Sequence, residues 1–404
     1  MKWKRIVRAL AGGLALLLIG VALDAWISHA RRESRLEALR AAGDPVSLAD
    51  LTKRDVTPAI NVCSYLTPIR DDAEALYNAI HPYAHADGFN WRAGLSPEQV
   101  TGTTTGIAKF PQVFPAIERA AGCNQHAADL DAAHGVSAFV ASSIVAANQM
   151  RTAARLLDCR GRYLGATGHP DEAAKAYLVG LQLTRLQDQE PTLMIFLVNI
   201  ACRSIAIHGL NGLLQTSSLT AETHAAIEAE LVRHDAMDQF VHALRTERAV
   251  GIESFGELPG LPWVTNSAFI SYLDVLDQQL TWGAASQHDI ASLQRVNARG
   301  IAAPIDPTLD AARESLNRSR AMFRCLRVLN QLRARAVPAE EFSINTLGIP
   351  RDATLDPYSG KPLTIRHTDT GRLVYSVGKN LRDDGGKLDN LSDIGVGPPE
   401  IMAE

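Results

Sequence analysis

The chain of 404 residues contains five cysteines, and their spacing excludes some kinds of cysteine-based site. The five form no C-x-x-C pair and no zinc-site spacing, and their odd number leaves at least one thiol free. Cys159, Cys202 and Cys325 lie within apolar helical patterns and are expected to pack as small hydrophobic side chains. Cys63 and Cys123 lie in less regular stretches, where two free thiols are favoured and a disulfide between them is the alternative.

Basic residues are not in excess either. Lysine and arginine total 40 against 44 aspartates and glutamates, so the formal charge of -4 provides no positive surplus for nucleic acid. Gly360-Lys361 is followed by Pro362 and lacks the Ser or Thr of a phosphate-binding loop, and no dinucleotide fingerprint is present. We therefore expect neither a nucleic-acid nor a nucleotide partner.

One long apolar run lies near the N-terminus. Residues 9–23 are uncharged, and Trp3 and Trp26 flank them. In a helix these tryptophans would lie roughly 35 Å apart, close to the thickness of a bilayer core plus one interface. The pattern predicts a membrane-spanning anchor over residues 1–30, with the membrane as a partner.

A cleaved secretory signal is the alternative to an uncleaved anchor. Ser28-His29-Ala30 resembles a cleavage site, but Asp24, Trp26 and His29 make it a poor one, so the uncleaved anchor is favoured. The slight bias of lysine and arginine toward the N-terminal side favours a cytoplasmic N-terminus. We expect a single-pass protein of the bacterial cell membrane with its body in the periplasm. The absence of cysteine near the run excludes a lipid-modified cysteine there.

The rest of the chain predicts a mainly α fold. Residues 31–50 form a charged amphipathic stalk helix that ends at Gly43 and Pro45, and residues 51–300 form a helical bundle or degenerate helical-repeat body. The apolar run over residues 193–214 is interrupted by Arg203 at its middle, which indicates a helix buried in the body and not a second span.

One helical hairpin resembles a tetratricopeptide repeat unit. Small residues alternate with large ones at the spacing expected of such a unit: Leu157, Gly161, Leu164, Gly168, Ala173, Tyr177 and Gly180. A second copy at the same interval is missing, so a regular array is not expected.

Two sets of residues in the body could carry chemistry. Glu247 and Glu253 are the carboxylates that a hydrolytic site would use, although a polar cluster that orients packed helices, with Glu247 paired to a nearby arginine, is favoured. The histidines between 208 and 242 suggest a metal or acid-base site, but solvated faces of long helices are the favoured interpretation: His208, His224, His234 and His242.

The C-terminal part, residues 301–404, predicts a helix followed by a small antiparallel β module. A helix is expected over residues 307–336, and two β-prone runs at 363–367 and 372–377 are joined by a turn ending at Gly371.

This C-terminal segment resembles the C-terminal region of the type II secretion major pseudopilin. The shared features are Asp356-Pro357, Ser359-Gly360-Lys361-Pro362, the run 373–378 and an acidic glycine-rich loop that ends at Asp393-Ile394. The resemblance implies a Ca²⁺ site in that loop, with these candidate ligands: Asn380, Asp383, Asp384, Asp389 and Asp393. A solvated acidic turn without metal is the alternative. The cleaved glycine and helical glutamate of a pilin are missing, so polymerisation is not expected.

The arrangement of anchor, stalk, helical body and tail is also similar to that of a group of membrane-anchored bacterial proteins with no known activity. We expect a membrane-anchored extracytoplasmic protein that binds partners or scaffolds an envelope assembly. The alternative is an extracytoplasmic hydrolase with a carboxylate-based site in the helical body.

Overall fold

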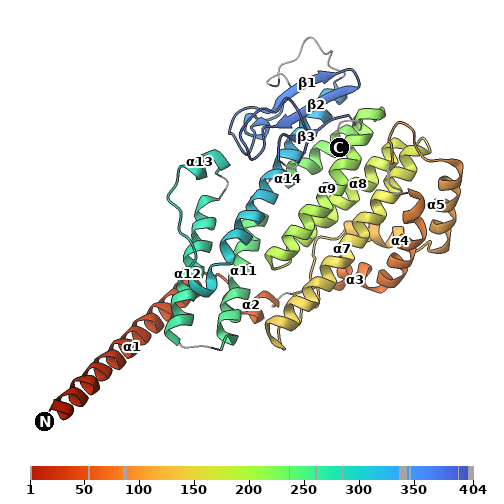
Figure 1. Ribbon diagram of the computed structural model, residues 1–404. Coiled ribbons are helices and arrows are strands. Elements are labelled where there is room, and N and C mark those ends of the chain that lie inside the picture. Colours follow the sequence, from red (N-terminus) through yellow and green to blue (C-terminus); the bar gives the residue numbers. More distant parts are fainter. Residues whose placement is uncertain are drawn as a thin grey trace.

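The computed structural model describes residues 2–52, 55–84, 89–235, 237–259, 262–283, 285–335, 344, 347–389 and 391–398, and confirms a mainly α protein with a small antiparallel sheet (Figure 1). The α-helices are α1 Lys2–Ala41, α2 Leu48–Thr52, α3 Cys63–Leu66, α4 Arg70–Ala84, α5 Pro97–Lys109, α6 Val113–Ala121, α7 Gly135–Ala166, α8 Pro170–Gln187, α9 Leu193–Thr216, α10 Ala221–His234, α11 Asp238–Glu257, α12 Pro262–Trp282, α13 Gln287–Ala291 and α14 Ile305–Ala334.

The first helix projects from the body. Helix α1 runs unbroken through the segments expected to be anchor and stalk, and only its C-terminal part packs on the body, against α12 (Figure 1). The helix ends at Ala41, and Gly43 supplies the left-handed φ of +75° that turns the chain away. On the projecting part, the side chains of Ile19 and Trp26 are 63% and 68% exposed.

An ion-pair network attaches α1 to the body. Arg35 donates to Asp274 at 3.0 Å and to Asp277 at 2.6 Å on α12. The buried Arg248 of α11 donates to the second oxygen of Asp277 at 2.9 Å and to Asp44, just after α1, at 2.5 Å. The arginine pairing considered for Glu247 is not observed among the described residues: Glu247 accepts the amide hydrogen of Leu193, and the neighbouring Arg248 forms the ion pairs, with aspartates of other segments.

The predicted hairpin within residues 157–180 is formed by α7 and α8. Tyr177 of α8 is fully buried between two glycines, Gly161 of α7 and Gly209 of α9. A Cβ atom would lie 2.4 Å from the Tyr177 ring at Gly161 and 2.1 Å from it at Gly209. The glycines therefore let three helices approach one aromatic side chain, whose hydroxyl donates to Asp158 at 3.2 Å.

The apolar helix α9 lies in the body. Among the residues whose side chains the structure describes, which leave out 2–12 and 14–18 of α1, it is the one helix long and apolar enough to span a membrane, and 56% of its most apolar window is buried inside the protein. Arg203 in its middle is 4% exposed and pairs with the buried Asp188, which also accepts a hydrogen bond from Asn199 at 3.1 Å. The expectation of a buried helix is confirmed, since the charge is neutralised inside the bundle.

The sheet shares one apolar core with the helices. Strands β1 Thr364–Thr368, β2 Gly371–Ser376 and β3 Ile394–Val396 are antiparallel in that order, and the two predicted runs form β1 and β2. Strands β2 and β3 pack on α14, and Val374 and Val396 belong to the same core as side chains of α8, α9 and α10. Strand β3, which was not expected, completes this cover over α14.

The carboxylate of Asp356 organises the turn before the sheet. It accepts hydrogen bonds from the hydroxyls of Ser359 and Ser376, both at 2.7 Å, and from the amide of Tyr358 at 2.9 Å. The buried Tyr358 in turn donates to Glu314 of α14 at 2.9 Å. This motif therefore connects the turn to both β2 and α14.

We expect substitution of Gly209 by alanine to destabilise the protein by about 1–3 kcal/mol, because the new methyl group would overlap the Tyr177 ring. Gly256→Ala is the matched control, since no atom lies within 4 Å of its added Cβ and α11 gains a better helix former. Urea unfolding of both variants measures the difference. Equal free energies of unfolding would contradict the packing around Tyr177.

Candidate functional sites

Glu247, predicted as the first carboxylate of a hydrolytic site, lies beside the start of α9. Its Oε2 accepts the amide hydrogen of Leu193 at 3.0 Å, and burial raises the pKa of its carboxyl group. The residue before Leu193, Thr192, has a φ of +88°, a strained value for a β-branched side chain. The hydroxyl of Thr246 accepts the Thr192 amide hydrogen at 3.2 Å and helps to hold this conformation.

A mostly apolar cavity of about 460 Å³ opens next to Glu247. Helices α7, α9 and α11 and the start of α14 supply its lining: Val140, Ser143, Arg151, Thr192, Leu193, Met194, Leu197, Val198, Ala201, Glu247, Val250 and Thr308. Glu247 is the one carboxylate among these residues. The cavity can hold a small apolar group near an acceptor of raised pKa.

The second predicted carboxylate does not join the first. Glu253 lies six residues further along α11, which places it about 120° around the helix from Glu247. It does not line the cavity. The structure therefore separates the two carboxylates that a paired acid-base mechanism would need.

The predicted histidine set does not converge, and the expectation that all four face solvent is wrong for two of them. His224 is buried and contacts Asn330 of α14 at 2.7 Å. His234 is buried too, and its ring stacks on Phe323 at a centroid distance of 5.0 Å. These side chains face inward because α10 packs against α14.

The acidic loop between β2 and β3 is organised by its own backbone. Asp393 is fully buried and accepts the amide hydrogens of Asp384 at 3.3 Å and Gly386 at 2.7 Å. Asp389 accepts those of Leu391 and Ser392 at 2.7 and 2.6 Å.

The other predicted ligands lie in the same loop. Asp383 accepts a hydrogen bond from the hydroxyl of Tyr375 at 2.9 Å, and Asp384 accepts one from the side-chain amide of Asn380 at 2.7 Å. Burial, then the nearby charges of Asp383 and Asp384, raise the pKa of Asp393. Within the described residues, no three His, Cys, Asp or Glu side chains are placed to hold a metal ion.

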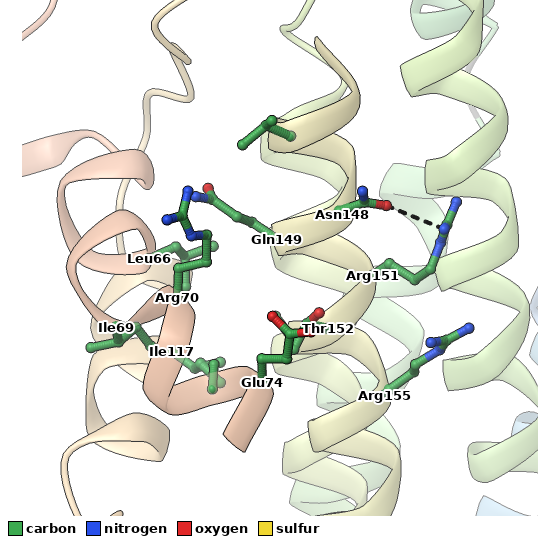
Figure 2. Close-up of a pocket in the computed structure, with 13 residues that line it drawn as sticks. Leu66, Ile69, Arg70, Glu74, Ile117, Asn148, Gln149, Arg151, Thr152 and Arg155 are labelled. Carbon is green, nitrogen blue, oxygen red and sulfur yellow. Dashed lines mark hydrogen bonds between the residues drawn. The ribbon is translucent and has the colours of Figure 1, made fainter. Parts of the chain in front are cut away.

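A groove of about 390 Å³ lies between α4, α6 and α7 (Figure 2). Its apolar floor includes Leu66, Ile69 and Ile117, and its polar side chains are Arg70, Glu74, Asn148, Gln149, Arg151, Thr152 and Arg155. Figure 2 shows Arg70 and Gln149 reaching toward each other from α4 and α7. Three arginines against one glutamate give the groove a positive balance.

A second group of titratable side chains escaped prediction. Cys63, His126 and Glu190 come together, although they are far apart in sequence. Both Cys63 and Cys123 are free thiols, and Cys159, Cys202 and Cys325 are buried as expected. No local sequence motif connects Cys63 to the other two residues. Cys63 and His126 come together because the backbone hydrogen bond from Val62 to Gln125 joins their two segments, which the sequence does not show.

The chain matches no protein family, no curated protein and no solved structure.

We expect Glu247→Gln to raise the melting temperature at pH 7 by roughly 1–3 °C. The folded pKa of Glu247 lies above its unfolded value, so the ionised carboxylate costs stability at neutral pH, and glutamine still accepts from Leu193. The gain should shrink as the pH falls through the raised pKa and vanish near the unfolded value. Glu253→Gln is the matched control on the same helix. If Glu247→Gln lowered the melting temperature more than this control, the raised pKa of Glu247 would be contradicted.

Proposed function

We propose that this protein is a single-pass, membrane-anchored extracytoplasmic protein whose helical body binds or scaffolds a partner in the bacterial cell envelope. The observation that carries the proposal is the open, positively charged groove of Figure 2. A groove with mixed polar and apolar walls can accept side chains of a polypeptide segment. The arginine balance favours an acidic segment.

The anchor is supported by the exposed apolar side chains of α1. The side chains of Ile19, Leu23 and Trp26 on α1 are more than half exposed. Exposed apolar side chains in a row are costly in water and favourable in a bilayer. Arg31 follows and is exposed, which suits contact with lipid phosphates where a helix leaves the membrane, whereas Arg32 donates to Asn266 of α12 at 3.3 Å.

One experiment tests the anchor and the groove separately. We expect the full chain to stay in the membrane fraction after an alkaline carbonate wash, and a partner to co-purify after detergent extraction.

Arg70→Glu should reduce partner recovery about tenfold, because it reverses a charge in the groove. Within the described residues Arg70 pairs with Asp71 at an exposed position, so stability should hardly change.

Arg299→Glu is the matched control, an equal charge reversal at an exposed site outside the groove. Carbonate extraction of the chain would contradict the anchor. Equal partner recovery with both variants would contradict the groove.

The hydrolase remains the alternative, and Glu247 is the observation in its favour. A carboxyl group of raised pKa beside an apolar cavity can act as a general acid or base. A hydrolytic mechanism needs a second group, and Glu253 does not reach the cavity, so binding is the better supported function.

We also propose that the acidic loop binds Ca²⁺, on the basis of its resemblance to the pseudopilin loop. The charges of Asp383 and Asp384 disfavour ionised Asp393, and a cation would relieve this repulsion. Carboxylates with backbone carbonyls and water form the oxygen ligand set that Ca²⁺ prefers.

We expect millimolar Ca²⁺ to raise the melting temperature of the full chain by a few degrees relative to EDTA, because a ligand that binds only the folded state stabilises it. Mg²⁺ should give a smaller shift, since it demands a tighter octahedral site. Asp389→Asn should reduce the Ca²⁺ shift. Identical melting in Ca²⁺ and EDTA would exclude the metal site.

A further inference from the structure

The thiol of Cys63 lies against a buried histidine. Its Sγ is 3.8 Å from Nδ1 and 4.0 Å from Nε2 of His126, whose side chain is 3% exposed. Cys63 itself is partly exposed. The cluster thus combines a partly exposed cysteine with a buried histidine.

A carboxylate contacts the same ring nitrogen of His126. Nδ1 of His126 lies 3.1 Å from Oε1 of Glu190, and that oxygen also accepts the amide hydrogen of Ala128 at 2.9 Å. Burial lowers the pKa of His126, but the contacts with Cys63 and Glu190 outweigh burial and raise it to about 9. These contacts favour the protonated imidazole, and a cation beside a sulfur favours the thiolate over the thiol.

The backbone holds the two parts of the cluster in register. The amide of Val62 donates to the carbonyl of Gln125 at 2.9 Å. The buried side-chain oxygen of Asn61 accepts the amide hydrogens of both Cys63 at 3.3 Å and Ala127 at 3.0 Å. Sulfur, imidazole and carboxylate are therefore positioned before any ligand arrives.

We propose that Cys63 is a nucleophilic thiol that exchanges with disulfides, with His126 and Glu190 as its positioning residues. A histidine beside a cysteine is a pairing that activates cysteine nucleophiles, and here the His126 ring contacts both the Cys63 sulfur and the Glu190 carboxylate. This inference does not depend on the proposed function, since it uses neither the groove nor the anchor.

The exchange balances without an added oxidant. The Cys63 thiolate attacks one sulfur of a disulfide, a new S–S bond forms, and the original S–S bond breaks. The leaving thiolate takes the bonding electron pair and accepts a proton from solvent. The product is a mixed disulfide on Cys63.

Acyl transfer fits this site less well. A tetrahedral oxyanion needs backbone donors beside the nucleophile. The amide of Cys63 donates to the Asn61 side chain, that of Ser64 to the Asn61 carbonyl, and that of Tyr65 to the Val62 carbonyl. The amides around the sulfur are already used, whereas disulfide exchange requires none of them.

Cys123 is a control within the same chain. It is also a partly exposed free thiol, and its Sγ lies 3.6 Å from the carbonyl oxygen of Arg119. Burial, then the nearby Cys63, raise the pKa of the Cys123 thiol, which lowers its reactivity at neutral pH.

The test uses the detergent-solubilised full chain and the aromatic disulfide 5,5′-dithiobis(2-nitrobenzoate), with peptide mass spectrometry to assign each mixed disulfide. We expect Cys63 to react at pH 7 about tenfold faster than Cys123, because a protonated imidazole lies beside its sulfur. This comparison needs only the wild-type chain. A Cys63 rate equal to or below that of Cys123 would overturn the proposal.

The variant Glu190→Gln tests the positioning role. Among the residues that the structure describes, Cys63 and Glu190 are the titratable groups that act on the pKa of His126, and Cys123 lies near Cys63. Loss of the carboxylate should slow Cys63 and make its rate depend on pH between 6 and 8 as steeply as that of Cys123. A folded variant with the wild-type rate and pH profile would refute the role of Glu190. A folded variant that reacts more slowly but keeps the wild-type pH profile would show that Glu190 is merely structural.

Discussion

The buried guanidinium of Arg248 holds three separate segments of the chain together. It contacts Asp277 of α12 and Asp44 beyond α1, and Asp277 also receives Arg35 of α1. A buried charge that loses its partner costs several kcal/mol, so these contacts form or break together. Any membrane or partner attached to α1 would consequently hold the helical body in a fixed orientation, because the connection is a packed joint and not a hinge.

The same use of buried polar groups continues through the body. Asp188 neutralises Arg203 within α9, and on α14 the buried Arg324 and Arg327 pair with Asp235 and Glu228 of the α10 region. Apolar packing between alanine-rich and leucine-rich helices tolerates sliding, since many registers bury similar area. Charge pairs do not, because each fits one register. The polar core therefore fixes how the helices stack.

The sequence predicted elements whose signals are local. The α7 and α8 hairpin, the buried α9 and strands β1 and β2 follow from periodicity, from the central Arg203 and from a turn at Gly371. It missed what depends on distant segments: the third strand, the inward-facing His224 and His234, and the meeting of Cys63 with His126. Glu247 stays a candidate carboxylate, and its surroundings come from α7 and α9, which no local pattern on α11 reveals.

The groove and the thiol cluster are built on neighbouring elements, and this argues that the two are positioned together. Leu66 of the groove and Cys63 are the two ends of α3, and α3 packs on α6, which contributes Ile117 to the groove floor. A ligand that displaced α3 by even a small distance would change the separation between Cys63 and His126. A rigid α3 would instead leave thiol reactivity independent of groove occupancy. Because Asn61 and Val62 tie the start of α3 to residues 125–127, the rigid arrangement is the better supported one.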